Sequence, residues 1–190
     1  MVTVDAKRKG TTFGEIVKRL SALQSRAIYV GIPAANTKRK DELINNAELL
    51  YIHTHGIRKK EMRREMDKDM GKGMKYSEAF SLYIQSNGSP LWHAPPRPVI
   101  EPAIEANQER IAERIKKVIQ AAGEGDAEGE ERAIHNAGQF AVNQCRAWFT
   151  NPKNGWPANS PSTIAEKGSA NPLIDTGTMR KAITYVVKEG

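Results

Sequence analysis

The sequence is poor in the features that support several common protein classes. Among its 190 residues there is one cysteine, Cys145, so no disulfide can form within the chain. Such cysteine usage fits a reducing cytoplasm, where a buried thiol packs as a small apolar side chain. No apolar run approaches the roughly 20 residues that span a bilayer, and residues 1–10 lack the apolar core of a secretion signal. We therefore expect no disulfide scaffold and no membrane contact.

Catalytic signatures are also missing. The sequence contains no glycine-rich phosphate loop of the Walker or Rossmann type and no Gly-x-Ser-x-Gly nucleophile turn. Four acidic residues lie among lysines and arginines, where an exposed, salt-paired helix face explains them better than acid–base catalysis: Glu61, Glu65, Asp67 and Asp69. A nuclease built on such carboxylates and a lysine stays open as an alternative. We nevertheless expect no enzyme and no cofactor.

Three histidines raise the question of a metal site. His53 and His55 are two residues apart, and His93 follows later. That spacing places the first two on different faces of a helix, although on one face of a strand. A metal site needs three or four converging ligands and partners that orient them, and no acid or cysteine has a suitable spacing. We expect packing or polar contacts from these histidines and no bound metal.

The chain is basic, with a formal net charge of +7 and a pI of about 9.5. Its positive residues form clusters in the first half of the chain: Lys7-Arg8-Lys9, Lys38-Arg39-Lys40, Arg58-Lys59-Lys60 and Arg63-Arg64. Its acidic residues gather later, at Glu124, Asp126, Glu128, Glu130 and Glu131. Opposed charge patches would let copies of the chain dock head to tail, and two ordinary solvated faces explain the pattern equally well.

Hydrophobic periodicity predicts the N-terminal elements. Apolar residues at helical spacing predict a helix over 12–25, and a β-prone run predicts a strand over 27–32. Asp41 is a suitable cap for a second helix, which ends near Gly56. We expect residues 1–10 to be flexible.

Residues 57–91 differ in character and are interpreted as a charged insertion with one or two helices. Four of its methionines are spaced by four, at Met62, Met66, Met70 and Met74. On a helix this spacing gives a slanted stripe, and Gly71 and Gly73 weaken the helix where the stripe ends. A methionine stripe suits contact with an imperfectly matched partner, and packing within the subunit is the alternative.

The second half of the chain is predicted to contain two long helices, over 101–122 and 127–150. The stiff, proline-rich segment from Pro95 to Ile100 precedes the first of them. The small residues Ala137, Gly138 and Ala141 would let the second helix approach its neighbour closely. A structured loop over 151–172, anchored by Trp156, leads to a final strand over 182–187 that can pair with the strand over 27–32.

The approach to that final strand is the best-specified stretch of backbone. Asp175 and Thr176 are residue types that cap helices, and Gly177 is the permissive residue at which a chain reverses. They specify backbone geometry without any catalytic group. This favours a part of an assembly over an enzyme.

Five short motifs occur in a characteristic order over roughly residues 28–187. They are Val30-Gly31-Ile32-Pro33, the run from Asn46 to Gly56, Pro96-Arg97-Pro98, the run from Trp156 to Ile164, and the run from Pro172 to Met179. In this order the chain resembles the tail-completion, or head–tail joining, proteins of long-tailed bacteriophages and prophages. Two departures are Thr54-His55, where the family often has an acidic and an aromatic residue, and the unusual length of the insertion.

The resemblance implies a single α+β domain over 1–190, in which a small, twisted, mainly antiparallel sheet packs against two or three long helices. It implies a structural virion protein that forms a ring, commonly a hexamer, in the neck between head and tail. The expected partners are further copies of the chain, the head connector or stopper proteins, the tail tube or tail terminator protein, and DNA in the central channel. The expected locations are the virion and, during assembly, the host cytoplasm.

Three elements are the candidates for function within that picture. Pro96, Arg97 and Pro98 set the entry of the long helix, and Asp175, Thr176 and Gly177 fix the register of the last strand. The insertion reaches a neighbour or DNA, above all through Arg58, Lys59, Lys60, Arg63 and Arg64 and the methionines. The alternative function is a cytoplasmic accessory protein that binds DNA without sequence preference, through phosphate contacts of this basic segment.

Overall fold

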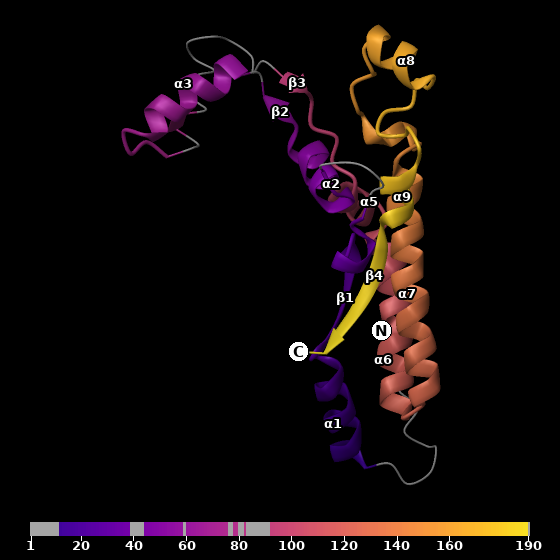
Figure 1. The fold of residues 1–190 in the computed structure, drawn as a ribbon. Helices are drawn as coiled ribbons and strands as arrows, with labels where there is room; N and C mark the ends of the chain where they lie inside the picture. The colour runs from indigo at the N-terminus through magenta and orange to yellow at the C-terminus, as the bar shows by residue number, and fades with distance from the viewer. Residues whose placement is uncertain are drawn as a thin grey trace.

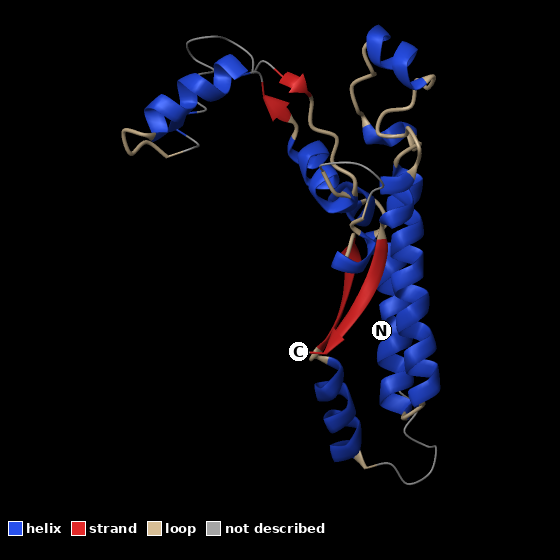
Figure 2. Cartoon of the chain, in the orientation of Figure 1, coloured by secondary structure: helices blue, strands red, loops and turns tan. Residues whose placement is uncertain are grey.

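The computed structural model describes residues 12–38, 44–58, 60–75, 78–79, 82 and 92–189. In this part of the chain helices predominate, and the strands form two separate two-stranded ribbons, as Figure 2 shows. The helices are α1 (Phe13–Leu23), α2 (Asn46–His55), α3 (Lys60–Met70), α5 (Ile100–Glu105), α6 (Gln108–Glu124), α7 (Ala127–Trp148), α8 (Pro161–Lys167) and α9 (Thr178–Ala182). The strands are β1 (Arg26–Gly31), β2 (Ile57–Arg58), β3 (Trp92–Ala94) and β4 (Thr184–Glu189). The mixture of helix and sheet agrees with the α+β class.

The helices α6 and α7 form a long antiparallel hairpin, against which α1, α5 and the β1–β4 ribbon pack (Figure 1). Gly125 reverses the chain between the two helices at φ +74°, where a side chain would be strained. Asp126 then caps α7 by accepting a hydrogen bond from the Gly129 amide at 2.9 Å. Ile134, Ala137 and Ala141 form a buried apolar stripe on α7 at helical spacing.

The β1–β4 ribbon packs on α7, and its antiparallel pairing confirms the predicted partnership of the first and last strands. Gly138 makes this packing close. A Cβ atom at that position would lie 2.4 Å from Cδ2 of Tyr185 on β4. The small residue predicted to permit close approach therefore faces a strand.

The main core lies where α2, α5, α7 and α9 meet. Its buried members are Leu50, Val99, Ala103, Cys145, Trp148, Phe149, Met179 and Ile183. The core joins residues that are more than a hundred positions apart in the sequence. It therefore holds the α2 region and the C-terminal segment on the same end of the hairpin.

The structure corrects three of the sequence-based predictions. The predicted helix over 101–122 is two helices, because the side chain of Asn107 donates to the Ala103 carbonyl at 2.9 Å and the backbone leaves helical geometry there. The cap of α2 is Asn45, whose side chain accepts from the backbone amides of Ala47 and Glu48, and Asp41 lies outside the described residues. The stretch over 151–172 contains α8, which is capped by Ser160, within the predicted loop.

Candidate functional site

Arg97, in the proline-rich motif, lies at the junction of three segments. The flanking Pro96 and Pro98 have no amide hydrogen, so Arg97 supplies the backbone donor of this motif. Its amide donates to the carbonyl oxygen of His53 near the end of α2, at 2.6 Å. The motif thereby ties the entry of α5 to α2.

The guanidinium of Arg97 binds a second distant segment, at Pro157 and Ala158. Arg97 as a whole is 8 % exposed. Its guanidinium donates from Nε and Nη2 to the carbonyl of Pro157, at 3.2 and 2.8 Å, and from Nη2 to the carbonyl of Ala158 at 3.2 Å. Burial lowers the pKa of this guanidinium from its usual value. Arg97 therefore acts as a clamp between segments, and its charge is not presented to solvent.

Trp156 confirms its predicted role as an anchor of the stretch over 151–172. Its indole nitrogen donates to the carbonyl of Pro98 at 3.1 Å, and its ring meets Phe149 edge-on at a centroid distance of 6.0 Å. The loop and the proline-rich motif are thus joined from both sides, by Trp156 and by Arg97.

The Asp175–Gly177 turn leads into α9, as the residue types predict, but the cap differs. Gly177 is the N-cap residue at φ +73° and has no side chain to accept a hydrogen bond. Thr176 instead accepts from the Thr178 amide at 3.4 Å and exchanges a hydroxyl hydrogen bond with Thr178 at 2.7 Å. The expectation that Asp175 or Thr176 is the N-cap is therefore wrong by one or two residues.

Arg146 completes this region and is a residue that sequence reasoning missed. Its guanidinium donates to the Ile183 carbonyl from Nε at 3.1 Å and from Nη2 at 2.7 Å, and to the Lys181 carbonyl at 2.9 Å. These bonds fix the start of β4 against α7. Its position in the last turn of a long helix resembles an ordinary solvated charge, so no local sequence signal distinguishes it.

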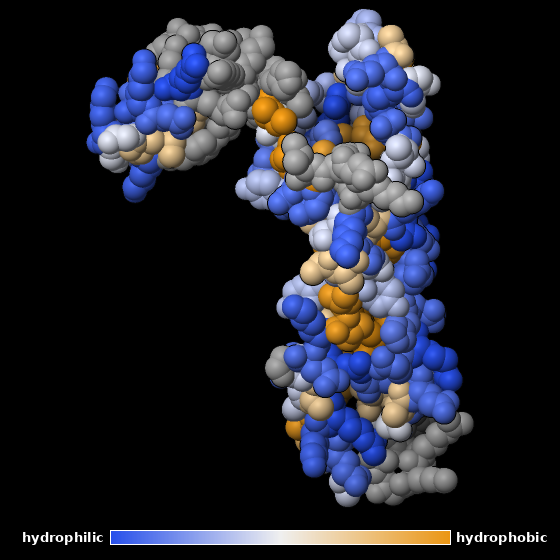
Figure 3. Space-filling model, viewed as in Figure 1, coloured by the Kyte–Doolittle hydropathy of each residue, from blue (hydrophilic) through white to orange (hydrophobic). Residues whose placement is uncertain are grey.

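The described helix of the insertion, α3, lies away from the hairpin, beyond the β2–β3 ribbon (Figure 1). Arg64 is exposed on α3, as are Lys68, Lys72 and Lys75 in the same segment. The side chains of Arg58, Lys60, Met62 and Arg63, and all of Lys59, lie outside the described residues. Hydrophilic residues predominate on the visible face of α3 (Figure 3), and the carboxylates of Asp67 and Glu78 are exposed beside these cations. The described part of this arm, as we call the insertion over 57–91, therefore carries both signs of charge.

The methionines of the insertion do not form one helical stripe. α3 ends at Met70, and Gly73 turns the chain at φ +89° before Met74. Met66 is buried, whereas Met70 is 40 % exposed. The spacing by four predicts a continuous helix, but Gly71 and Gly73 end it one methionine early.

The acidic cluster is bound largely within the subunit. Arg26 of β1 donates to Glu130 at 2.9 Å and to Glu131 at 2.7 Å, and it lowers the pKa of Glu131. Arg132 pairs with Glu128 at 3.3 Å. The bonds of Arg26 fasten the ribbon to α7, and all three pairs reduce the charge left for a head-to-tail contact.

The described residues show neither a metal cluster nor a reactive thiol. No group of three or more His, Cys, Asp or Glu side chains among them could hold a metal ion. His55 Nδ1 lies 2.8 Å from the Tyr51 carbonyl oxygen. Burial raises the pKa of the Cys145 thiol to about 11, which suppresses its thiolate.

Among the described residues, no helix combines the length and apolar character needed to cross a bilayer.

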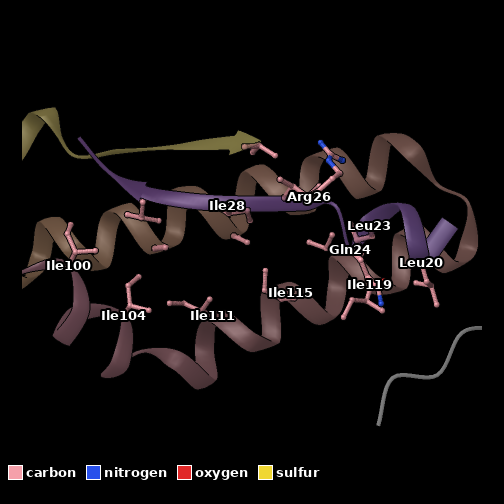
Figure 4. Close-up of a pocket in the computed structure, with 16 residues that line it drawn as sticks. Leu20, Leu23, Gln24, Arg26, Ile28, Ile100, Ile104, Ile111, Ile115 and Ile119 are labelled. Atoms are coloured by element: carbon pink, nitrogen blue, oxygen red, sulfur yellow. The ribbon is translucent and has the colours of Figure 1, made fainter. Parts of the chain in front are cut away.

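An apolar groove runs along one side of the β1–β4 ribbon (Figure 4). Its volume is about 670 Å³, and its lining comes from α1, β1, α5, α6, α7 and β4. Arg26 and Gln24 are its polar lining residues. Such a groove offers burial of apolar side chains and no catalytic group.

Comparison with known proteins found no matching family model, no matching curated protein and no matching solved structure.

Proposed function

We propose that this chain is a structural, non-enzymatic neck component of a long-tailed bacteriophage or prophage, which forms a ring between the head connector and the tail tube around the DNA channel. The observation that carries the proposal is the convergence of motifs that the sequence separates. Arg97 joins the proline-rich motif to the motif that contains His53 and to the motif that contains Pro157. The segment that follows Pro172 adds α9, which packs on α2.

This junction is what a subunit of a rigid ring needs. Its bonds run from side chains to backbone carbonyls, so they fix the paths of several loops relative to the helical hairpin. These hydrogen bonds within the subunit keep the surface loops in fixed positions for contact with neighbouring subunits. Heterologous contacts close a ring only if the rotation between neighbouring subunits matches the symmetry of the ring. In the assembled ring, the two-stranded ribbon and the long helices are the sheet and helix layers of the subunit.

The proposed ring has a direct test in the purified protein. Negative-stain electron microscopy and native mass spectrometry should find closed oligomers, hexamers above all. Deletion of the gene from the phage genome should leave unjoined heads and tails. Normal particles without this chain would overturn the proposal.

A second candidate function, non-specific DNA binding, is favoured by the exposed basic side chains of the extended arm. Arg64, Lys68, Lys72 and Lys75 are exposed there, together with the carboxylates of Asp67 and Glu78, and Lys72 pairs with Asp69 at 3.8 Å. Gel-shift titrations at two salt concentrations distinguish the two functions, because an accessory protein that works through phosphate contacts should bind free DNA tightly and lose affinity steeply with salt. A neck subunit meets DNA in its ring, and its monomer should bind free DNA weakly.

A further inference from the structure

The apolar groove lies beside β1, where the two-stranded β1–β4 ribbon ends and the helical hairpin of α6 and α7 continues beneath it. Both strands of the β1–β4 ribbon pack on α7, whereas the main packing partners of α6 are α7, α1 and α5. Figure 4 shows β1 on one side of the groove and Ile111, Ile115 and Ile119 of α6 on the other. Neighbouring strands lie about 4.8 Å apart, and packed helices lie about 8–10 Å apart. A third strand beside β1 would therefore lie over α6.

The edge of β1 that borders this groove carries backbone amides and carbonyls that can pair with a further strand. Among the described residues β1 pairs with β4 alone. Every second amide and carbonyl of β1 points away from β4, and such an edge is a template for one more strand. An added strand would satisfy these groups and would place alternate side chains in the groove.

The chain itself contains a segment with the required pattern, before the first described residue. Val2, Val4 and Ala6 alternate with the polar residues Thr3 and Asp5. Alternation of this kind presents one apolar face and one polar face in a strand. The apolar face matches the groove, and the polar face matches solvent.

The length of the intervening chain is sufficient. α1 contains 11 residues and spans about 17 Å. The five residues of 7–11 reach about 17 Å when extended, so they can return along α1 to the beginning of β1. Residues 2–6 would then run antiparallel to β1, as β4 does.

Charge complementarity supports the same path. Arg19 of α1 lies against the α6–α7 turn, because a Cβ atom on Gly125 would be 2.5 Å from its guanidinium. The beginning of α1 is thus on the side of the acidic residues Glu124 and Asp126. The cluster Lys7-Arg8-Lys9 would pass beside them along this route.

We propose that residues 2–6 of the same chain add a third antiparallel strand to the free edge of β1 and fill the apolar groove with Val2, Val4 and Ala6. The sequence-based expectation of a flexible segment over 1–10 concerns residues outside the described part of the chain, and the proposal differs from it for residues 2–6. This proposal does not depend on the function in the phage neck.

Hydrogen exchange of the β1 amides tests the added strand. We compare the full chain with a deletion of residues 2–9, with Val4→Asp, which puts a carboxylate into the groove, and with Thr3→Asp on the polar face as the matched control. The β1 amides that point away from β4 should exchange at least about tenfold slower in the full chain and in Thr3→Asp than in the other two. The β1 amides that face β4 report whether each variant remains folded. Equal exchange of the edge amides in the full chain and in the deletion would overturn the proposal.

A spin label distinguishes the same chain from a neighbouring copy. The label is attached to Thr3→Cys, and the NMR signals of Tyr29 and Val30 are followed. The proposal expects broadening when label and isotope are on one chain, and none when spin-labelled chains are mixed with isotope-labelled ones. Broadening in the mixed sample would assign the groove to a neighbouring copy, and no broadening in either sample would leave it without this strand; both results contradict the proposal.

Discussion

Substitution by alanine is expected to change stability in opposite directions at two helical glycines, Gly138 and Gly14. Gly138 of α7 faces the ring of Tyr185, where a Cβ atom would lie 2.4 Å from Cδ2 and 2.7 Å from Cγ. Movement of the Tyr185 ring away from α7 would break the hydrogen bond between its hydroxyl and His135 Nδ1, which is 2.6 Å long. Gly14 of α1, by contrast, has only the hydroxyl of Thr12 within reach of a Cβ atom, at 3.9 Å.

The expected magnitudes follow from these distances. Gly→Ala in the middle of a helix gains about 0.5–1 kcal/mol where there is room, so Gly14→Ala, in the first turn of α1, should stabilise by up to about that amount. At Gly138 an overpacking cost of about 1–3 kcal/mol opposes the same gain, and Gly138→Ala should destabilise by about 0.5–2 kcal/mol. Urea unfolding followed by circular dichroism measures both free energies.

A double-mutant cycle identifies the cause of the difference. In a Tyr185→Ala background the clash is gone, so Gly138→Ala should lose its cost and behave like Gly14→Ala. A stabilising Gly138→Ala in the original chain would refute the close contact between α7 and β4. An unchanged cost in the Tyr185→Ala background would assign it to another neighbour.

Three further substitutions and treatments test the rest of the account. Arg97→Met should destabilise by about 2–4 kcal/mol in urea unfolding, because the carbonyls that the buried guanidinium binds lose their donors, and a cost under about 0.5 kcal/mol would contradict the clamp. Arg26 lowers the pKa of Glu131, so the stability that this carboxylate contributes is present above its unfolded pKa of about 4.3 and is lost as pH falls through the folded pKa. Glu131→Gln should therefore cost less than about 1 kcal/mol at pH 7, and urea unfolding should show this cost shrinking as the pH is lowered below the unfolded pKa; a cost that grows on acidification would contradict the pair. With its pKa at about 11, Cys145 should resist iodoacetamide at pH 8 in the folded protein and react after unfolding, and rapid labelling of folded protein would contradict its burial.

Local sequence patterns predict the helices and strands whose structure is determined by their own hydrophobic periodicity and residue preferences. The stripe on α7 and the β-prone segments need only their own periodicity, and the structure has them as a helix and as paired strands. The break before α6 escapes this reasoning, because Asn107 continues a helical pattern until its side chain binds the Ala103 carbonyl.

The candidate site is harder to predict because its contacts join distant segments. Pro96 and Pro98 indicate a stiff segment, but nothing near Arg97 indicates that it binds carbonyls some 60 residues later, at Pro157. An arginine in a sequence is by default expected to be exposed to solvent, because arginine is seldom buried without a partner. Only the packing of α2, α5 and the loop after α7 gives Arg97 a buried position. Arg146 also binds carbonyls of a distant segment, those of Lys181 and Ile183, and local sequence does not indicate that either.

The measurement that tests the central claim most directly is a count of this chain in finished phage particles. Quantitative mass spectrometry of purified virions, with immunogold labelling seen by electron microscopy, should find several copies of it per particle, all at the head–tail junction. Intact, infectious particles that lack the chain would contradict its role as a neck subunit.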